Sequence, residues 1–223
     1  MTTRYGAAEL YGFDVTALAP ERIRELASAK NKDLPCPFKP RETSKPVPKC
    51  HKKGGVCSLR QYGQEASTVT AVGQPVTTCP SRFLEKNLIF EWVGETLLGT
   101  KTPVVISELP FLMSSEAAGE EEENGDAVGK IDKVLVNTGG EPLKWCALEM
   151  QAVYFSGKSM ENDFALMRTW AGPGLPFPQV QRRPDFRSSG PKRLMPQLQV
   201  KVPTISRWGK KIGVNAVELS LRA

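Results

Sequence analysis

The chain has 223 residues, 24% of them charged, and a formal net charge of +6 at pH 7, which indicates one sizeable domain or a core with a small appended module. No stretch approaches the roughly 18 consecutive apolar residues of a membrane span, and the polar N-terminus does not resemble a secretory signal, so we expect a soluble protein without membrane contact. The only histidine, His51, lies in a Lys/Gly-rich loop, which argues against Ser-His-Asp and Cys-His catalysis. Phosphate-loop and dinucleotide motifs are absent, so no nucleotide cofactor is expected.

In chain order, an irregular start precedes a helix predicted over residues 20–27, with Pro20 in its first turn. A second helix is predicted from Ser81 to Leu98, with Gly99 as its stop. Its core face is predicted from apolar residues at helical spacing, namely Phe83, Leu84, Leu88, Trp92 and Val93.

Three strands should follow: a short buried one at residues 104–106, a second at 131–136 and a longer third at 143–155. The sequence Asn-Thr-Gly-Gly at 137–140 predicts a hairpin turn between the last two. An acidic Gly/Ser-rich stretch at 114–127 predicts a surface loop.

Further helices are predicted over residues 158–170 and, as a short piece, over 204–212. Together these elements predict an α/β fold.

Residues 31–80 are rich in Pro, Lys, Gly and Thr and poor in large apolar residues, so we expect something other than a hydrophobic core to hold them. They contain four of the five cysteines, Cys36, Cys50, Cys57 and Cys79. Four thiolates can hold a tetrahedral zinc or iron ion in place of a core. Two alternatives stay open: disulfides, which are disfavoured in a chain without a secretion signal, and free structural thiols.

Two carboxylates and an amide fall on neighbouring predicted strands. Asp132 stands near the start of one strand, and Glu149 and Gln151 share one face of the next because side chains alternate. A hairpin can bring Asp132 opposite this pair, and such a set would bind a hard cation such as Mg²⁺. The alternative is a pair of solvated surface carboxylates, but Glu149 lies in an otherwise apolar strand, where an unpaired carboxylate is costly. Cys146, on the opposite face of the same strand, is interpreted as a buried core thiol.

Four motifs, in order along the chain, resemble the NotI-type restriction endonucleases. They are residues 54–62 (GGVCSLRQY), 78–83 (TCPSRF), 129–136 (GKIDKVLV) and 146–157 (CALEMQAVYFSG). More broadly, Asp132 with Glu149-x-Gln151 resembles the Asp…(Asp/Glu)-x-Lys core of the restriction-endonuclease superfamily. The similarity extends from Cys36 to Lys211, which is most of the chain.

The resemblance implies a restriction-endonuclease-like core, a mixed central sheet flanked by helices, over residues 81–223. It also implies an N-terminal four-cysteine module over residues 1–80, in which it favours iron over zinc. The implied function is that of a type II restriction endonuclease of the bacterial cytoplasm. Such a homodimer cuts GC-rich palindromic double-stranded DNA with Mg²⁺.

By the same resemblance, Asp132 and Glu149 are Mg²⁺ ligands, and Gln151 orients the attacking water or the metal shell. Glu108 is a candidate further acidic member of the site, with a strand-end surface carboxylate as the alternative. An Arg-rich segment suits a GC-rich site, because arginine binds guanine bidentately. The DNA-contact candidates are therefore Arg182, Arg183, Arg187, Lys192 and Arg193. A solvated basic surface is the alternative for this segment.

Two departures from the family pattern affect these expectations. A lysine in place of Gln151 could bring a positive charge to the phosphate, so we expect the metal to neutralise more charge here. NotI-like chains continue well beyond the point equivalent to Lys211, which keeps a second hypothesis open: a non-cleaving DNA-binding protein with a structural four-cysteine metal. A third, an RNA-binding metal ribbon, lacks the expected aromatic platform.

Overall fold

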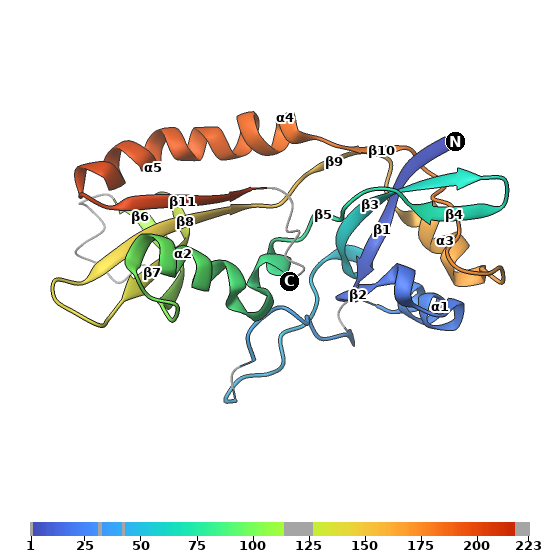
Figure 1. Ribbon diagram of the computed structural model, residues 1–223, viewed down its shortest axis with the longest axis horizontal. Helices are drawn as coiled ribbons and strands as arrows, with labels where there is room; N and C mark the ends of the chain where they lie inside the picture. The colour runs from blue at the N-terminus through green and yellow to red at the C-terminus, as the bar shows by residue number, and fades with distance from the viewer. Residues whose placement is uncertain (1, 31–32, 42, 114–126, 217–223) are drawn as a thin grey trace. The chain divides into compact units, whose positions relative to one another are not determined.

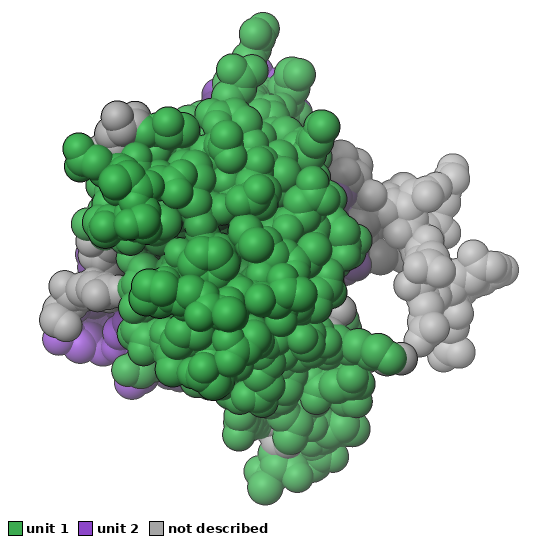
Figure 2. Space-filling view, turned by 90° about the vertical axis from the view of Figure 1, so that its right-hand side faces the viewer, with its two compact units in different colours: residues 1–86, 152–192, 216–223 green, residues 87–151, 193–215 purple. Residues whose placement is uncertain are grey.

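The computed structural model describes residues 2–30, 33–41, 43–113 and 127–216 (Figure 1). The chain forms two compact units, which Figure 2 colours separately: residues 1–86, 152–192 and 216–223 in the first, and residues 87–151 and 193–215 in the second. Residues 152–192 pack with the first unit. None of the described helices is long and apolar enough to cross a membrane.

The first unit is built on a five-stranded antiparallel sheet. Its order is β2 (Phe13–Asp14), β1 (Thr2–Leu10), β3 (Val56–Glu65) and β4 (Thr68–Ala71), and β5 (Val76–Thr77) also pairs with β3. A two-stranded sheet joins β9 (Phe155–Gly157) to β10 (Arg182–Pro184). The helices are α1 (Pro20–Ser28), α3 (Glu161–Thr169) and the short α4 (Phe186–Ser189), of which α1 and α3 pack together.

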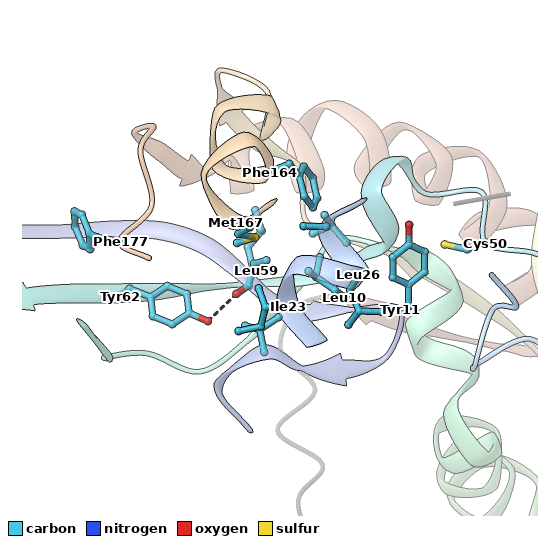
Figure 3. Close-up of a cluster of buried hydrophobic side chains, with 14 residues drawn as sticks. Leu10, Tyr11, Ile23, Leu26, Cys50, Leu59, Tyr62, Phe164, Met167 and Phe177 are labelled. Carbon is cyan, nitrogen blue, oxygen red and sulfur yellow. Dashed lines mark hydrogen bonds between the residues drawn. The ribbon is translucent and has the colours of Figure 1, made fainter. Parts of the chain in front are cut away.

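A hydrophobic core fills this unit, as Figure 3 shows. Helix α1 contributes Ile23 and Leu26, and β3 contributes Leu59 and Tyr62, whose hydroxyl donates to the Ala7 carbonyl at 2.6 Å. Each fully buried large apolar side chain stabilises the fold by about 1.5–3 kcal/mol. The expectation that residues 31–80 lack a hydrophobic core is therefore wrong for β3. The helix expected at 20–27 is confirmed as α1.

The second unit contains a four-stranded sheet and two helices. The strand order is β11 (Lys211–Ala216), β8 (Lys144–Gln151), β7 (Ala127–Asn137) and β6 (Val104–Met113), and β6, β7 and β8 pair antiparallel. Helix α2 (Leu88–Leu98) packs against β7 and β8, and α5 (Met195–Arg207) packs through Ile205 onto Val134 and Ala147. The expected α/β class is thus confirmed.

Strand β8 is buried on both faces. Cys146 and Leu148 are at most 1% exposed on one face, and Ala147 and Glu149 are at most 1% exposed on the other. The burial predicted for Cys146 is confirmed. Glu149 therefore holds a core position, and only a partner for its charge can compensate for the lost hydration.

Several predicted boundaries moved. Helix α2 begins at Leu88 rather than Ser81 because Lys86 and Asn87 take positive φ angles of 48° and 59°, which break the helix. Its end at Gly99 is confirmed: this glycine has φ +72° and its N–H caps the last turn. Trp92, placed in the core by the prediction, is 68% exposed.

The strands and the last helix also differ from the expectations. The predicted short buried strand belongs to the longer edge strand β6, with Val104 50% exposed. The third strand stops at Gln151 and a separate strand, β9, follows. The helix expected at 204–212 ends at Arg207, where the chain turns into β11. The predicted acidic loop at 114–127 lies almost wholly outside the described residues.

Candidate active site

The β7–β8 hairpin brings two of the predicted acidic residues side by side. The strands pair with Lys133 opposite Leu148, and one step further in the same register Asp132 lies opposite Glu149. The Asn137 side chain supports the connecting turn by accepting the Gly139 N–H at 2.8 Å. Because directly opposed residues share one face of a sheet, Asp132 and Glu149 lie on the same face.

Asp132 is held where the strand pairing ends. Its Oδ2 accepts the N–H of Met150 at 2.8 Å, so the side chain binds the backbone of the neighbouring strand. Burial raises the pKa of Glu149 above its ordinary value, the Lys201 hydrogen bond opposes this, and the charge of Asp132 raises the pKa further. The two carboxylates are therefore close enough to repel each other, an arrangement that attracts a cation.

A buried lysine from α5 pairs with Glu149. The ammonium of Lys201 donates to Glu149 Oε2 at 2.8 Å, to the Lys130 carbonyl at 2.5 Å and to Gln197 Oε1 at 3.1 Å. The side chains of Lys201 and Glu149 are 4% and 1% exposed. The three N–H groups of the ammonium are thus satisfied inside the unit.

The second carboxylate oxygen of Glu149, Oε1, differs from Oε2 in its hydrogen bonding. Oε1 is buried and makes no hydrogen bond of standard geometry to any residue in the described ranges, although a backbone hydrogen bond from Asp132 to the Glu149 carboxyl contributes to lowering its pKa. A buried carboxylate oxygen without a hydrogen bond costs roughly 1–3 kcal/mol or more, and it is a ligand of the kind that Mg²⁺ prefers. This atom, close to the Asp132 carboxylate, is a candidate ligand for a hard cation.

Two carboxylates suffice for such a cation if water and phosphate complete its shell. Within the described part of the chain, no group of three or more His, Cys, Asp or Glu side chains is gathered for metal binding. Mg²⁺ usually takes one or two protein carboxylates together with waters and substrate phosphates. The pair formed by Asp132 and Glu149 fits that mode.

The other two predicted members lie at the edge of this pair. Gln151 follows two residues after Glu149 on β8, on the same face, and is partly exposed. Glu108 falls between the pairs Ser107–Lys133 and Leu109–Ile131, across from Asp132, where its φ of +53° interrupts β6. Its side chain is 74% exposed, with Oε2 3.9 Å from Lys130 Nζ.

Sequence reasoning missed Lys201. Lys201 lies in a segment rich in basic residues, and Pro196 and Pro203 argue in the sequence against a continuous helix around it. One signal was available: Lys201 lies four residues before Ile205, so both share a helix face. The buried lysine is thus identified by packing rather than by composition.

The amino-acid sequence matches a known protein family. The family model described as restriction endonuclease NotI matches residues 21–219. This chain belongs to the NotI restriction endonuclease family. No curated protein and no solved structure matches the chain.

Membership in the NotI family supplies the general activity. Restriction endonucleases are hydrolases that cut double-stranded DNA at specific sites, and they generally use Mg²⁺. The matched residues include the whole β7–β8 hairpin and helix α5. The carboxylate pair thus lies within the part of the chain that the family model matches.

The predicted DNA-contact residues divide into two kinds. Arg182 is 4% exposed, pairs with Asp163 and donates to the carbonyls of Lys158, Ser159 and Tyr5. It is therefore engaged inside the first unit, which argues against a DNA contact. The exposed candidates are Arg183, Arg187, Lys192 and Arg193.

The four cysteines of the N-terminal region form two backbone-linked pairs. Cys36 and Cys50 are joined through a bridge between Pro35 and Lys49, and the Cys79 N–H donates to the Cys57 carbonyl at 3.2 Å. Three of the four, Cys36, Cys50 and Cys57, are buried.

The thiols of these pairs interact electrostatically. Burial raises the pKa of Cys50, and the charges of Cys36 and Cys79 raise it further. Burial also raises the pKa of Cys57, to which Cys79 and Cys50 contribute. The four thiols are thus neighbours, although they are not gathered as a metal-holding group in the described structure.

Proposed function

We propose that this NotI-family chain is a type II restriction endonuclease that hydrolyses both strands of a GC-rich palindromic duplex with Mg²⁺ held by Asp132 and Glu149. The observation that carries the proposal is the buried Glu149 carboxylate, with Oε2 bound to Lys201 and Oε1 without a hydrogen bond beside Asp132. A homodimer matches the two-fold symmetry of a palindromic site. Because its substrate would be foreign DNA that has entered the cell, we infer that the enzyme acts in the bacterial cytoplasm.

The proposed chemistry needs no imidazole. Mg²⁺ supplies a water of lowered pKa and neutralises charge that develops on the phosphate. Asp132, fixed by the Met150 N–H, and Glu149, fixed by Lys201, hold their carboxylates in place across the hairpin. Gln151 orients the attacking water or the metal shell, and Glu108 borders the site as a further acidic residue. The exposed Arg183, Arg187, Lys192 and Arg193 are the proposed DNA contacts.

Plasmid nicking with and without Mg²⁺ tests this function. We expect the wild type to cleave only with Mg²⁺, and Glu149→Gln to lose cleavage while still binding the duplex. Glu141→Gln, the same change at an exposed residue of the β7–β8 loop, is the matched control and should cleave normally. Full cleavage by Glu149→Gln contradicts the assignment. Duplex binding by the wild type without Mg²⁺-dependent nicking supports instead a non-cleaving DNA-binding protein.

A structural metal is a separate proposal. We propose that Cys36, Cys50, Cys57 and Cys79 hold one iron ion, with zinc as the alternative, because four neighbouring thiols suit a tetrahedral thiolate site. The thiols of Cys50 and Cys57 now lie 3.7 and 3.3 Å from the carbonyl oxygens of Lys52 and Gly55, contacts that metal binding would replace.

Elemental analysis of protein purified without added metal tests this site. We expect one equivalent of iron or zinc per chain, lost in Cys36→Ser and retained in Cys146→Ser. Wild-type protein that contains neither iron nor zinc, yet is folded and cleaves DNA when Mg²⁺ is added, contradicts the proposal.

A further inference from the structure

Helix α5 brings a positively charged side chain, Lys201, to the carboxylate pair. The Asp…Glu-x-Gln motif itself contains no such charge. Lys201 is 3% exposed, and its ammonium lies 2.8 Å from the carboxylate of Glu149. Its position is fixed by packing: Ile205, one turn later on the same helix face, is fully buried against Val134 and Ala147. The same face therefore places Lys201 beside Glu149, two residues along β8 from Ala147.

Folding stability does not explain this lysine well. A buried ion pair contributes little net stability, and well-packed apolar residues often replace it without loss. Here the Lys201 ammonium contacts only Oε2 of Glu149, Oε1 makes no hydrogen bond of standard geometry within the described residues, and a second carboxylate, Asp132, is close. In the buried pair of the first unit, by contrast, each Asp163 oxygen contacts a donor: Oδ1 the Gln179 N–H and Oδ2 the Arg182 guanidinium.

The charges of the site suggest what the lysine does. With both carboxyl groups ionised, Asp132 and Glu149 bring two negative charges, and Lys201 compensates the one on Glu149. Addition of one divalent cation leaves the site with a single net positive charge. A DNA phosphodiester carries a single negative charge, which grows during attack, so this balance favours its binding and its reaction.

We propose that Lys201 supplies from helix α5 the positive charge that Gln151 does not supply from β8. It is a positioning residue: it holds Glu149 through Oε2, leaves Oε1 for the divalent cation, and adds its charge to the field at the scissile phosphate. The inference rests on the proposed function and assigns one further residue to that site.

The central test removes the positive charge at residue 201 and then introduces one at residue 151. We expect Lys201→Met to lower Mg²⁺-dependent plasmid cleavage about 100-fold, the effect of losing one charge-stabilising group in an active site. In the double variant Lys201→Met/Gln151→Lys we expect most of the lost cleavage to return, because residue 151 shares the face of Glu149. Arg207→Met, which removes one exposed positive charge from the same helix, should leave cleavage unchanged.

A second measurement separates this role from a structural one. Without DNA, Lys201→Met should bind Mn²⁺ at least as tightly as the wild type by calorimetry, because the ammonium that repels the metal is gone. Lys201→Gln keeps a hydrogen-bond donor for Glu149 and covers the case in which Lys201→Met does not fold. It should be folded by circular dichroism and as poor in cleavage as Lys201→Met.

The outcomes distinguish the two proposals. Cleavage by Glu149→Gln overturns the nuclease site itself. If Glu149→Gln is inactive while a folded Lys201→Met or Lys201→Gln cleaves as well as Arg207→Met, only the role of Lys201 is overturned. Weakened Mn²⁺ binding in both lysine variants, with no rescue by Gln151→Lys, also overturns it, because Lys201 then merely supports the metal ligands.

Discussion

The two compact units each contain a buried ion pair, and the two pairs differ in what surrounds them. In the first unit, Arg182 donates to four backbone carbonyls, and Asp163 Oδ1 accepts the Gln179 N–H at 2.6 Å. Asp163 Oδ2 and Glu149 Oε1 both lack a hydrogen bond of standard geometry within the described residues, but Oδ2 contacts the Arg182 guanidinium, whereas the Lys201 ammonium contacts the other oxygen of Glu149, Oε2.

Burial of an ion pair is therefore not in itself a sign of function. The Arg182–Asp163 pair joins α3 to β1 and to the backbone of residues 158–159, so its charges are used for tertiary structure. The Lys201–Glu149 pair has ligand capacity left over, and a second carboxylate lies within electrostatic reach. An oxygen that is still available to a ligand distinguishes a candidate binding site from a purely structural ion pair.

The largest expected effect concerns the structural ion pair between Arg182 and Asp163. Arg182→Met should lower the free energy of unfolding by about 3–5 kcal/mol, because it leaves Asp163 as an uncompensated buried charge. Urea denaturation followed by circular dichroism measures this. Arg183→Met, one residue away but exposed, is the control and should change the stability by no more than about 0.5 kcal/mol. Equal stabilities of the two variants would show that Asp163 and Arg182 do not depend on each other.

The next effect concerns the site. Asp132→Asn should reduce single-turnover cleavage by about 100- to 1,000-fold, or about 3–4 kcal/mol, because the cation loses a charged ligand. Its unfolding free energy should change by only about 1 kcal/mol or less, because asparagine can still accept the Met150 N–H. A large loss of stability with normal cleavage would show that Asp132 has a structural role like that of Asp163.

Glu108 should show a smaller effect. Glu108→Gln is expected to lower cleavage about tenfold, the scale of an outer partner of a metal site. Its exposed pair with Lys130, at 3.9 Å, contributes little to stability, so denaturation should be unchanged. The comparison with Asp132→Asn, in the same nicking assay, ranks the two carboxylates. Wild-type cleavage would remove Glu108 from the site.

The smallest effect is expected at the exposed basic residues. Arg187→Met should weaken duplex binding a few-fold and reduce the slope of log affinity against log salt by about 0.9, the value for one phosphate contact. Fluorescence anisotropy at several salt concentrations measures both quantities. An unchanged slope would identify Arg187 as solvated surface, and a change in folding stability is not expected.

Local features of this chain were predictable from its sequence. Pro20 starts α1, Gly99 ends α2, and the turn at 137–140 joins β7 to β8, because capping and turn conformations depend on a few neighbouring residues. Alternation along β8 likewise predicted that Cys146 and Glu149 lie on opposite faces. The sequence alone therefore predicted that Asp132, Glu149 and Gln151 lie on neighbouring strands.

The partners of the charged side chains were decided by tertiary structure alone. Arg182 and Arg183 are adjacent and chemically identical, yet one is buried against Asp163 and the other is exposed. Lys201 lies 52 residues from Glu149 in a segment rich in exposed cations, and only the packing of α5 through Ile205 brings its ammonium to that carboxylate. Burial is a property of contacts between distant segments, so a basic stretch in a sequence cannot show which of its charges is inside.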